Sequence, residues 1–195
     1  MPVNKDPDGT AQHVNKEHRA LTFSITEDEA LHVNDDEGEA YSVLVDITPA
    51  TTDDDFFYLK NKSIKDLVIY EIEGWCADAN QEIKILIGAT DAGTNAGDTL
   101  TPINMRSISG GSADVDCAQD ATDLAISGGN VVSLLKFPTT ALELATFTFS
   151  AGIIITQNQR LHMEAALAGL INLNIYFYFH DKYSAIRQSE TTAFL

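Results

Sequence analysis

Every second side chain from Ile171 to Phe179 is large and apolar, and polar or aromatic side chains fill the positions between them. A period of two is typical of a β-strand with one buried face, and the abundance of β-branched and aromatic residues supports that interpretation. A shorter alternation runs from Leu161 to Ala165, and the Gly169 region between the two offers a place for the chain to reverse. We therefore predict a hairpin over residues 160–180, whose apolar face needs a second sheet to cover it.

Further short segments have the spacing of strands. Residues 51–75 are expected to form two antiparallel strands joined by a turn at Asn61–Ser63, with Val68, Tyr70 and Ile72 on one face. Residues 82–88 place alternate isoleucines on one face and are expected to belong to the covering sheet. The remaining candidates are residues 21–25, 41–47, 131–137, 142–149 and 152–155.

This count gives nine or ten strands, and no amphipathic helix is longer than a turn or two. The sequence therefore predicts an all-β fold, an antiparallel jelly-roll-like β-sandwich with extended N- and C-terminal arms. We expect an N-terminal arm at 1–18, a β-sandwich domain at 19–180 and a C-terminal arm at 181–195. Within the domain, residues 89–130 are expected to form a long ordered loop over the end of the sandwich, with a short strand around Thr101–Ile108.

The net charge of the chain limits the classes of partner that it is expected to bind. Lys and Arg total 12 against 29 Asp and Glu, a formal net charge of −17, which disfavours nucleic acid and anionic membranes and favours a basic protein surface. No apolar run approaches a membrane span and the first residues lack a signal-peptide core, so we expect a soluble protein that is not exported by that route. Cys76 and Cys117 are expected to be reduced, as in a cytoplasm.

Two places in the sequence contain residue types that bind metal ions. His162 and His180 fall on the two strands of the expected hairpin and could approach each other beside Glu164, but a zinc site needs three or four ligands, and histidines facing solvent or an interface are favoured. Asp53–Asp55 and Asp35–Glu37 could offer oxygen ligands to calcium. Neither run has the spacing of a calcium loop, so solvated acidic turns are favoured.

Two further groups of residues have the composition of a catalytic site and of a glycan site. Glu71 and Glu73 share a strand face as a pair of glycosidase carboxylates would, but ion pairs with Lys84 on the next strand are the favoured explanation. Trp75 could form an aromatic platform for sugar with Tyr70, Tyr176 and Tyr178, although a tryptophan that plugs the edge of the sandwich is favoured. We therefore expect no enzyme activity and no cofactor.

Seven short segments, in this order, carry a resemblance to a known group of proteins. They are Phe57–Asn61, Asp66–Ile69, Glu82–Gly88, Leu100–Asn104, Gly111–Asp114, Ser127–Val131 and Ile175–His180. Over Ser42–His180 the chain resembles virion structural proteins of tailed bacteriophages. The resemblance implies a non-enzymatic β-sandwich that binds the outer capsid shell as a decoration or cement protein, or, alternatively, a head- or tail-fibre component that binds a host receptor or glycan.

The resemblance also implies partners and a location. The expected partners are the major capsid protein or other virion proteins, with no nucleic acid and no membrane, in a virion assembled in the host cytoplasm. Arms that order on contact stabilise a shell at its subunit junctions, and cyclic homo-oligomers match capsid symmetry, so a trimer is expected first and a dimer second. The expected partner-contact residues are Val3, Val14, His18, Tyr176, Tyr178, His180, Tyr183, Ile186, Phe194 and Leu195.

Overall fold

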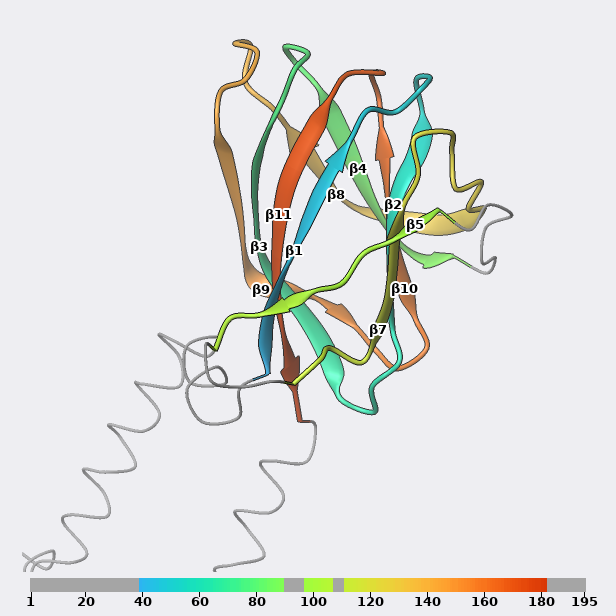
Figure 1. The fold of residues 1–195 in the computed structure, drawn as a ribbon, viewed down its shortest axis with the longest axis vertical. Helices are drawn as coiled ribbons and strands as arrows, with labels where there is room; N and C mark the ends of the chain where they lie inside the picture. The colour runs from blue at the N-terminus through green and yellow to red at the C-terminus, as the bar shows by residue number, and fades with distance from the viewer. Residues whose placement is uncertain (1–38, 90–96, 107–110, 182–195) are drawn as a thin grey trace, which may run out of the picture.

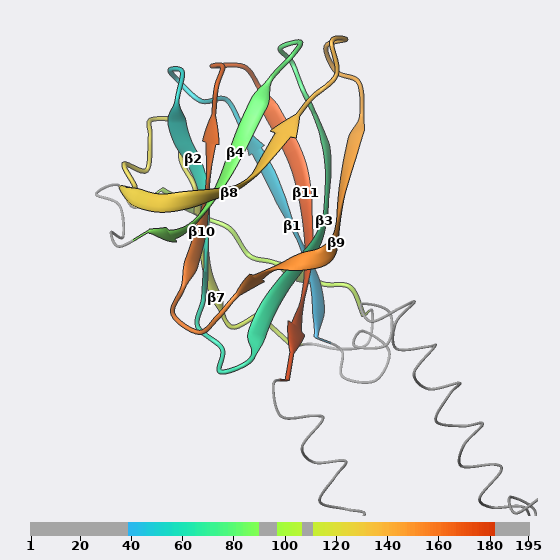
Figure 2. The same cartoon turned by 180° about the vertical axis from the view of Figure 1, so that it is seen from behind.

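The structure, a computed structural model, describes residues 39–89, 97–106 and 111–181. These residues form eleven strands and no helix, arranged as two antiparallel sheets that pack face to face (Figure 1, Figure 2). The strands are β1 (Ala40–Ile47), β2 (Asp54–Asn61), β3 (Asp66–Cys76), β4 (Glu82–Ala89), β5 (Asp98–Thr99), β6 (Ile103–Asn104), β7 (Val115–Gln119), β8 (Gly128–Lys136), β9 (Ala145–Ile155), β10 (Arg160–Ala165) and β11 (Ile171–His180). The predicted all-β sandwich is confirmed.

In each sheet the buried residues are concentrated in the inner strands. The five-stranded sheet has the order β6-β1-β11-β3-β9, and the six-stranded sheet has the order β5-β7-β2-β10-β4-β8. The inward row of β11 is fully buried, as the alternation predicts: Ile171, Leu173, Ile175 and Phe177 are all 0% exposed. The facing sheet contributes residues such as Leu161 and Met163 of β10 and Ile83 and Ile85 of β4 to the same core.

The predicted hairpin over residues 160–180 is wrong. Strand β10 pairs with β2 and β4, whereas β11 pairs with β1 and β3 in the other sheet. Residues 166–170 therefore cross from one sheet to the other, and the two apolar rows cover each other across the core instead of lying side by side. The buried side chain of Gln81 holds this crossover, because its Nε2 donates to the Leu167 carbonyl at 2.8 Å and its Oε1 accepts from the Leu167 amide at 2.9 Å.

The predicted pairing of the strands within residues 51–75 is also wrong, because β2 and β3 belong to different sheets. Asn61 ends β2 and is fully buried at the crossover. Its Nδ2 donates to the carbonyls of Lys65 and Ile155, both at 2.8 Å, and its Oδ1 accepts from the Ser63 amide at 2.9 Å. The side chain of one residue thus joins the end of a strand in one sheet to two segments of the other.

Two β-bulges change faces that strict alternation assigns. A bulge in β3 between Ile69 and Glu71 puts Ile72 in the core with Ile69, whereas the sequence analysis placed Ile72 with Val68 and Tyr70. A register shift opposite β2 lets Phe56 and Phe57 both be fully buried, although they are adjacent in sequence. An extra residue in one strand reverses the inward and outward positions that follow it.

The polar region 89–130 supplies strands to both sheets. The predicted strand around Thr101–Ile108 is present as the two-residue β6, which pairs with β1. Strands β5 and β7 extend the edge of the other sheet. The described residues from 97 to 119 therefore lie along one side of the sandwich and not over its end as expected, and residues 120–127 pass from β7 to β8, which β2, β10 and β4 separate. The expected strand at 21–25 and both arms, apart from Asp181, lie outside the described residues.

Candidate interaction surface

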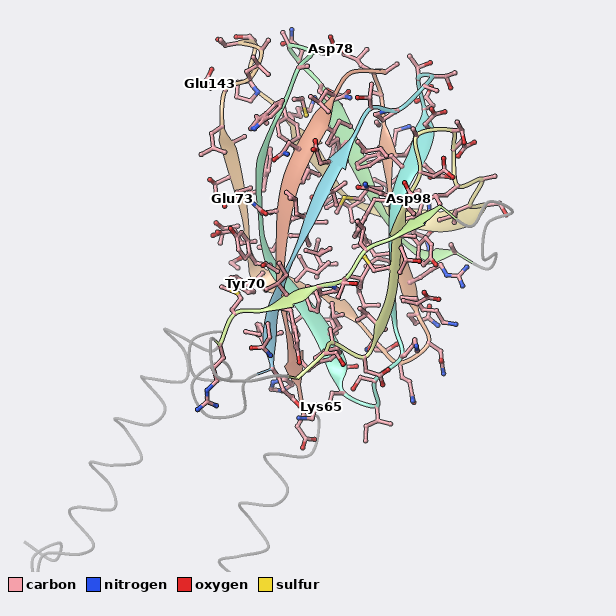
Figure 3. The ribbon with its side chains drawn as sticks, viewed as in Figure 1. Lys65, Tyr70, Glu73, Asp78, Asp98 and Glu143 are labelled. Carbon is pink, nitrogen blue, oxygen red and sulfur yellow. The ribbon has the colours of Figure 1, made fainter. Side chains whose placement is uncertain are left out.

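Three tyrosines gather on the outer face of the five-stranded sheet. Tyr176 and Tyr178 alternate with the core row of β11, so they face away from the core, and Tyr70 comes from the neighbouring strand β3. The ring centroid of Tyr70 lies 6.2 Å from that of Tyr176 and 5.9 Å from that of Tyr178. Figure 3 labels Tyr70 and Glu73 on this sheet. The bulge after Ile69 matters here, because it leaves Tyr70 outward while Ile72 turns inward.

The three rings differ in burial. Tyr178 is 6% exposed and packs with Ala40 and Val68, so it forms the floor of the cluster. Tyr70 and Tyr176 are half-buried and present part of each ring to solvent. The Tyr70 hydroxyl donates to the sulfur of Met105 at 3.8 Å, which joins the cluster to the residues after β6.

Exposed apolar side chains surround the cluster on the same face. Leu44 lies opposite Asn174, Ile103 opposite Ser42 and Ile154 opposite Val68 in the strand registers, and all three are outward positions. Their exposed fractions are 51%, 69% and 53%, and Met105 adds a fourth at 44%. We call Tyr70, Tyr176 and Tyr178 with these four residues the tyrosine face. No local pattern in the sequence marks these four residues, because three separate segments supply them: β1, β6 with the residue after it, and β9.

Two carboxylates lie beside the rings. The Tyr176 hydroxyl donates to Glu73, and this hydrogen bond, followed by burial, raises the pKa of Tyr176 to about 12. Burial and then the charge of Glu71 raise the pKa of Tyr70. Both phenols are therefore protonated at neutral pH. The expected ion pairs of Glu71 and Glu73 with Lys84 are wrong, because Lys84 belongs to the other sheet and contacts Glu164 and Asp53.

Trp75 does not join the tyrosines. It lies opposite Asn172, while Tyr176 lies opposite Glu71, so the two aromatic positions are four residues apart along the β3–β11 ladder. At about 3.3 Å per residue this separates them by roughly 13 Å. The structure thus brings together three of the four residues considered for an aromatic platform, and leaves the half-buried Trp75 apart from them.

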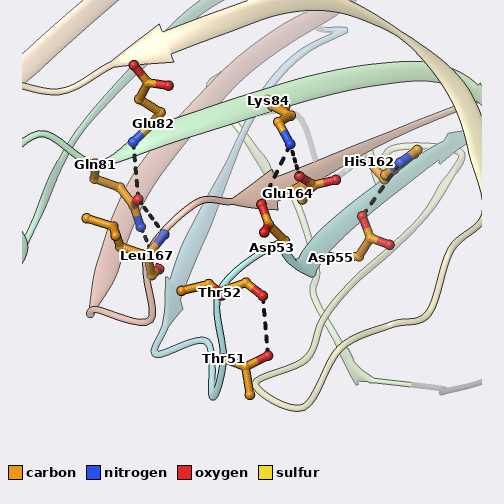
Figure 4. A network of polar contacts seen from close by, with 10 residues as sticks. All are labelled: Thr51, Thr52, Asp53, Asp55, Gln81, Glu82, Lys84, His162, Glu164 and Leu167. Atoms are coloured by element: carbon orange, nitrogen blue, oxygen red, sulfur yellow. Dashed lines mark hydrogen bonds and ion pairs between the residues drawn. The ribbon is translucent and has the colours of Figure 1, made fainter.

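His162 and His180 lie in different sheets, so the expected placement on one hairpin is wrong. His180 ends β11 opposite Asp66. His162 is 2% exposed, its Nε2 lies 3.6 Å from Oδ1 of Asp55, and its buried Nδ1 has no hydrogen-bond partner (Figure 4). The predicted solvent- or interface-facing role therefore does not hold for His162.

In the Asp55–His162 pair the histidine is neutral at neutral pH. Burial, and then the charge of Arg160, lowers the pKa of His162 to about 4. Burial, and then the charge of Asp123, raises the pKa of Asp55 to about 6, although Asp55 also accepts a hydrogen bond from the Ile126 amide at 3.1 Å. Near neutral pH the pair is a carboxylate beside a neutral imidazole. Both shifts mean that the fold destabilises the charged form of the group, so the pair contributes to the pH dependence of stability.

The acidic run Asp53–Asp55 sends its three carboxylates to three different partners. Oδ1 of Asp53 lies 3.7 Å from Nζ of Lys84 and Asp55 faces His162 (Figure 4). Asp54 accepts from the Thr51 amide at 2.7 Å and from the Thr51 hydroxyl at 2.6 Å. Throughout residues 39–89, 97–106 and 111–181, no three His, Cys, Asp or Glu side chains are grouped to hold a metal ion. The run Asp35–Glu37 lies outside these ranges.

The ten expected partner-contact residues divide into two groups. Tyr176 and Tyr178 lie in the tyrosine face and His180 ends the same strand, β11. The other seven lie outside the described residues: Val3, Val14, His18, Tyr183, Ile186, Phe194 and Leu195.

Comparison with models of known protein families, with curated proteins and with solved structures finds no match in any of the three. A search of the described part of the chain for a helix long and apolar enough to cross a membrane finds none.

Proposed function

We propose that this chain is a structural protein of a tailed-phage virion that binds the outer shell as a decoration or cement protein and catalyses no reaction. The observation that carries the proposal is the tyrosine face, an exposed apolar and aromatic surface on a sheet whose other face is fully packed. Apolar patches with tyrosine and methionine are typical of protein–protein interfaces, and isolated soluble domains rarely leave them uncovered.

The positions at which the chain enters and leaves the described sandwich also favour the tyrosine face as the contact surface. The Phe179 amide donates to the Glu39 carbonyl at 3.2 Å, and Ala40 lies opposite Tyr178. The chain thus enters and leaves the sandwich at one end, beside the tyrosine face (Figure 1). A partner seated on this face lies next to the points from which both terminal segments continue. Those segments contain the seven predicted contact residues outside the described ranges.

Charge indicates what kind of partner fits. A net charge of −17 steers the chain toward a basic surface and away from other acidic ones. The proposed partner is the major capsid protein or another virion protein, met in a virion assembled in the host cytoplasm. The bound form is a cyclic homo-oligomer, a trimer first and a dimer second, because such symmetry repeats on a shell.

A fibre component that binds a host receptor or glycan is the second candidate. The half-buried rings of Tyr70 and Tyr176 lie beside the carboxylates of Glu71 and Glu73. Aromatic faces pack on the C–H groups of a sugar ring, and carboxylates accept from its hydroxyls. This arrangement is the specific observation that favours the alternative.

Immunogold electron microscopy of purified particles distinguishes a shell-bound decoration protein from a fibre component. An antibody raised against the purified chain is applied to virions produced from the source of this sequence, with pre-immune serum as the control. The proposal expects gold over the head surface. Gold at fibre tips favours the alternative, and particles that neither bind gold nor contain peptides of this chain by mass spectrometry contradict both.

A pair of variants tests the tyrosine face itself. Leu44→Glu with Ile103→Glu places two charges in the proposed contact, and Ile64→Glu, at a residue 78% exposed in the turn before β3, is the matched control. Each protein is added to particles from which this chain has been deleted, and the bound fraction is measured by sedimentation. We expect the double variant to bind at least about tenfold more weakly, because buried unpaired charges are costly, and the control to bind like wild type. Equal binding by all three proteins contradicts the assignment of this face.

A further inference from the structure

Two long edge strands bound one side of the sandwich. Within the described residues, β8 pairs only with β4 and β9 only with β3, so each has one backbone edge with no strand beside it (Figure 2). These edges are nine and eleven residues long. On the opposite side the sheets end in β5 and β6, which are only two residues each. Very short edge strands are one way in which proteins prevent edge-to-edge pairing, so the β8–β9 side offers the longer open edges.

The β8–β9 side also lacks the charges that usually protect an edge. Residues 127–160 contain Glu143 as their one acid and Lys136 and Arg160 as their two bases, a net charge of +1. The remaining 161 residues contain the other 28 acids and 10 bases, a net charge of −18. Glu143 precedes β9 and lies at the far end of the molecule (Figure 3). The two edge strands themselves therefore contain no acidic residue, although Glu71 and Glu73 of β3 lie beside β9 and Glu82 of β4 pairs with Lys136 of β8.

Exposed apolar side chains are concentrated in this part of the chain. Five exposed large hydrophobic residues outside the tyrosine face fall within residues 127–160: Val131, Val132, Leu134, Leu142 and Leu144. Two inward-facing phenylalanines of β9, Phe147 and Phe149, are only half-buried at this side, although the core continues up to them. Long apolar edges pair readily with other strands.

We propose that the β8–β9 side is a self-association surface, and that its occupant is a second copy of this chain. The rest of the chain carries a net charge of −18, which opposes contacts between copies, whereas residues 127–160 are nearly neutral. Two identical edge strands can pair antiparallel about a two-fold axis, and the edge of β8 can also pair with β9 of a neighbour in a closed ring. Association extends the sheets, pairs the open backbone groups and covers the exposed apolar residues. This inference does not depend on the virion role, because it involves neither the tyrosine face nor a particle.

Molar mass in solution tests the proposal. Light scattering during size-exclusion chromatography is run over a dilution series on the full chain, on Val131→Glu with Leu144→Glu, and on Leu44→Glu with Ile103→Glu. The first pair is 56% and 63% exposed and the second 51% and 69%, so the two double variants add equal charge at similarly exposed positions. We expect wild type and the tyrosine-face variant to be oligomers and the β8–β9 variant to approach the 21.2 kDa monomer, with affinity at least about tenfold lower.

Hydrogen exchange of the wild-type protein locates the interface without a substitution. Amide protons at the free edges of β8 and β9 are expected to exchange slowly in concentrated wild-type protein and quickly on dilution, while those of central β11 stay slow at both concentrations. A wild-type chain that stays monomeric at all concentrations overturns the proposal. So does an oligomer that survives the β8–β9 substitutions with exchange at these edges unchanged by dilution. A loss of particle binding with intact self-association concerns the proposed function alone.

Discussion

Replacing Asn61 by alanine distinguishes the crossover seen in the structure from the hairpin that the sequence predicts. In a hairpin, Asn61 begins a surface turn, and its loss changes the free energy of unfolding by a few tenths of a kcal/mol, as is usual at exposed sites. In the structure it is 0% exposed and makes three hydrogen bonds, to the Lys65 and Ile155 carbonyls and from the Ser63 amide. The two folds therefore predict different costs for one substitution.

The magnitude follows from these bonds. A hydrogen bond contributes about 1 kcal/mol net, and a buried polar group left without a partner costs about 1–3 kcal/mol. The bond to the Ile155 carbonyl is buried, while the other two are partly open to water. We expect Asn61→Ala to lower the free energy of unfolding by about 3–5 kcal/mol. For a chain of this length that lowers the Tm by about 10 °C.

Thermal and urea unfolding monitored by circular dichroism measure this difference. Asn130→Ala is the matched control, because Asn130 is exposed on β8, and its Tm should stay within about 2 °C of wild type. A Tm for Asn61→Ala equal to that of Asn130→Ala would refute the assignment of Asn61 as a buried tie between the sheets.

Three further predictions concern buried groups. Because the pKa of Asp55 is raised from 3.8 to about 6, its ionised form destabilises the fold above that pH, so Asp55→Asn should raise the unfolding free energy at pH 8 by about 3 kcal/mol, with the gain fading to nothing near pH 4 in urea titrations. A Cβ at Gly74 would lie 2.1 Å from the Asn172 carbonyl oxygen, so Gly74→Ala should lower the Tm far more than Gly169→Ala, where the contact is the movable Asp78 side chain; similar Tm values for the two would contradict the β3–β11 register. Burial raises the pKa of Cys76 to about 12 and also raises that of Cys117, so neither thiol should react with Ellman's reagent at pH 8 until denaturant is added; rapid labelling of the native protein would contradict their burial.

Local periodicity located most of the long strands but not their partners; it missed β5 and β7, and it divided β9 into two candidates, residues 142–149 and 152–155. The alternation from Ile171 to Phe179 places the right side chains in the core, and Ile83 and Ile85 are buried as expected. A period of two says which residues share a face, yet it carries no information on the sheet that the strand joins. Both wrong hairpins arose in this way, since five residues or fewer can cross between packed sheets as well as turn within one.

The candidate surfaces were predictable only in part. Tyr176 and Tyr178 follow from the alternation of β11, whereas Leu44, Ile103, Met105 and Ile154 join them through long-range pairing that no local pattern reveals. Lys84 was expected beside Glu71 and Glu73 because the three are close in sequence, but the sheets separate them. The low acid content of residues 127–160 is visible in the sequence, and it gains its meaning once β8 and β9 are known to be edges.

Cryo-electron microscopy of particles with and without the gene for this chain tests the central claim most directly. The account predicts that the wild-type map contains extra density on the outside of the shell, shaped as a two-sheet sandwich with the tyrosine face turned toward the capsid, and that this density is absent from the deletion map. Identical maps over head and fibres, with the chain absent from both particles, would contradict the proposal that it acts as part of the virion.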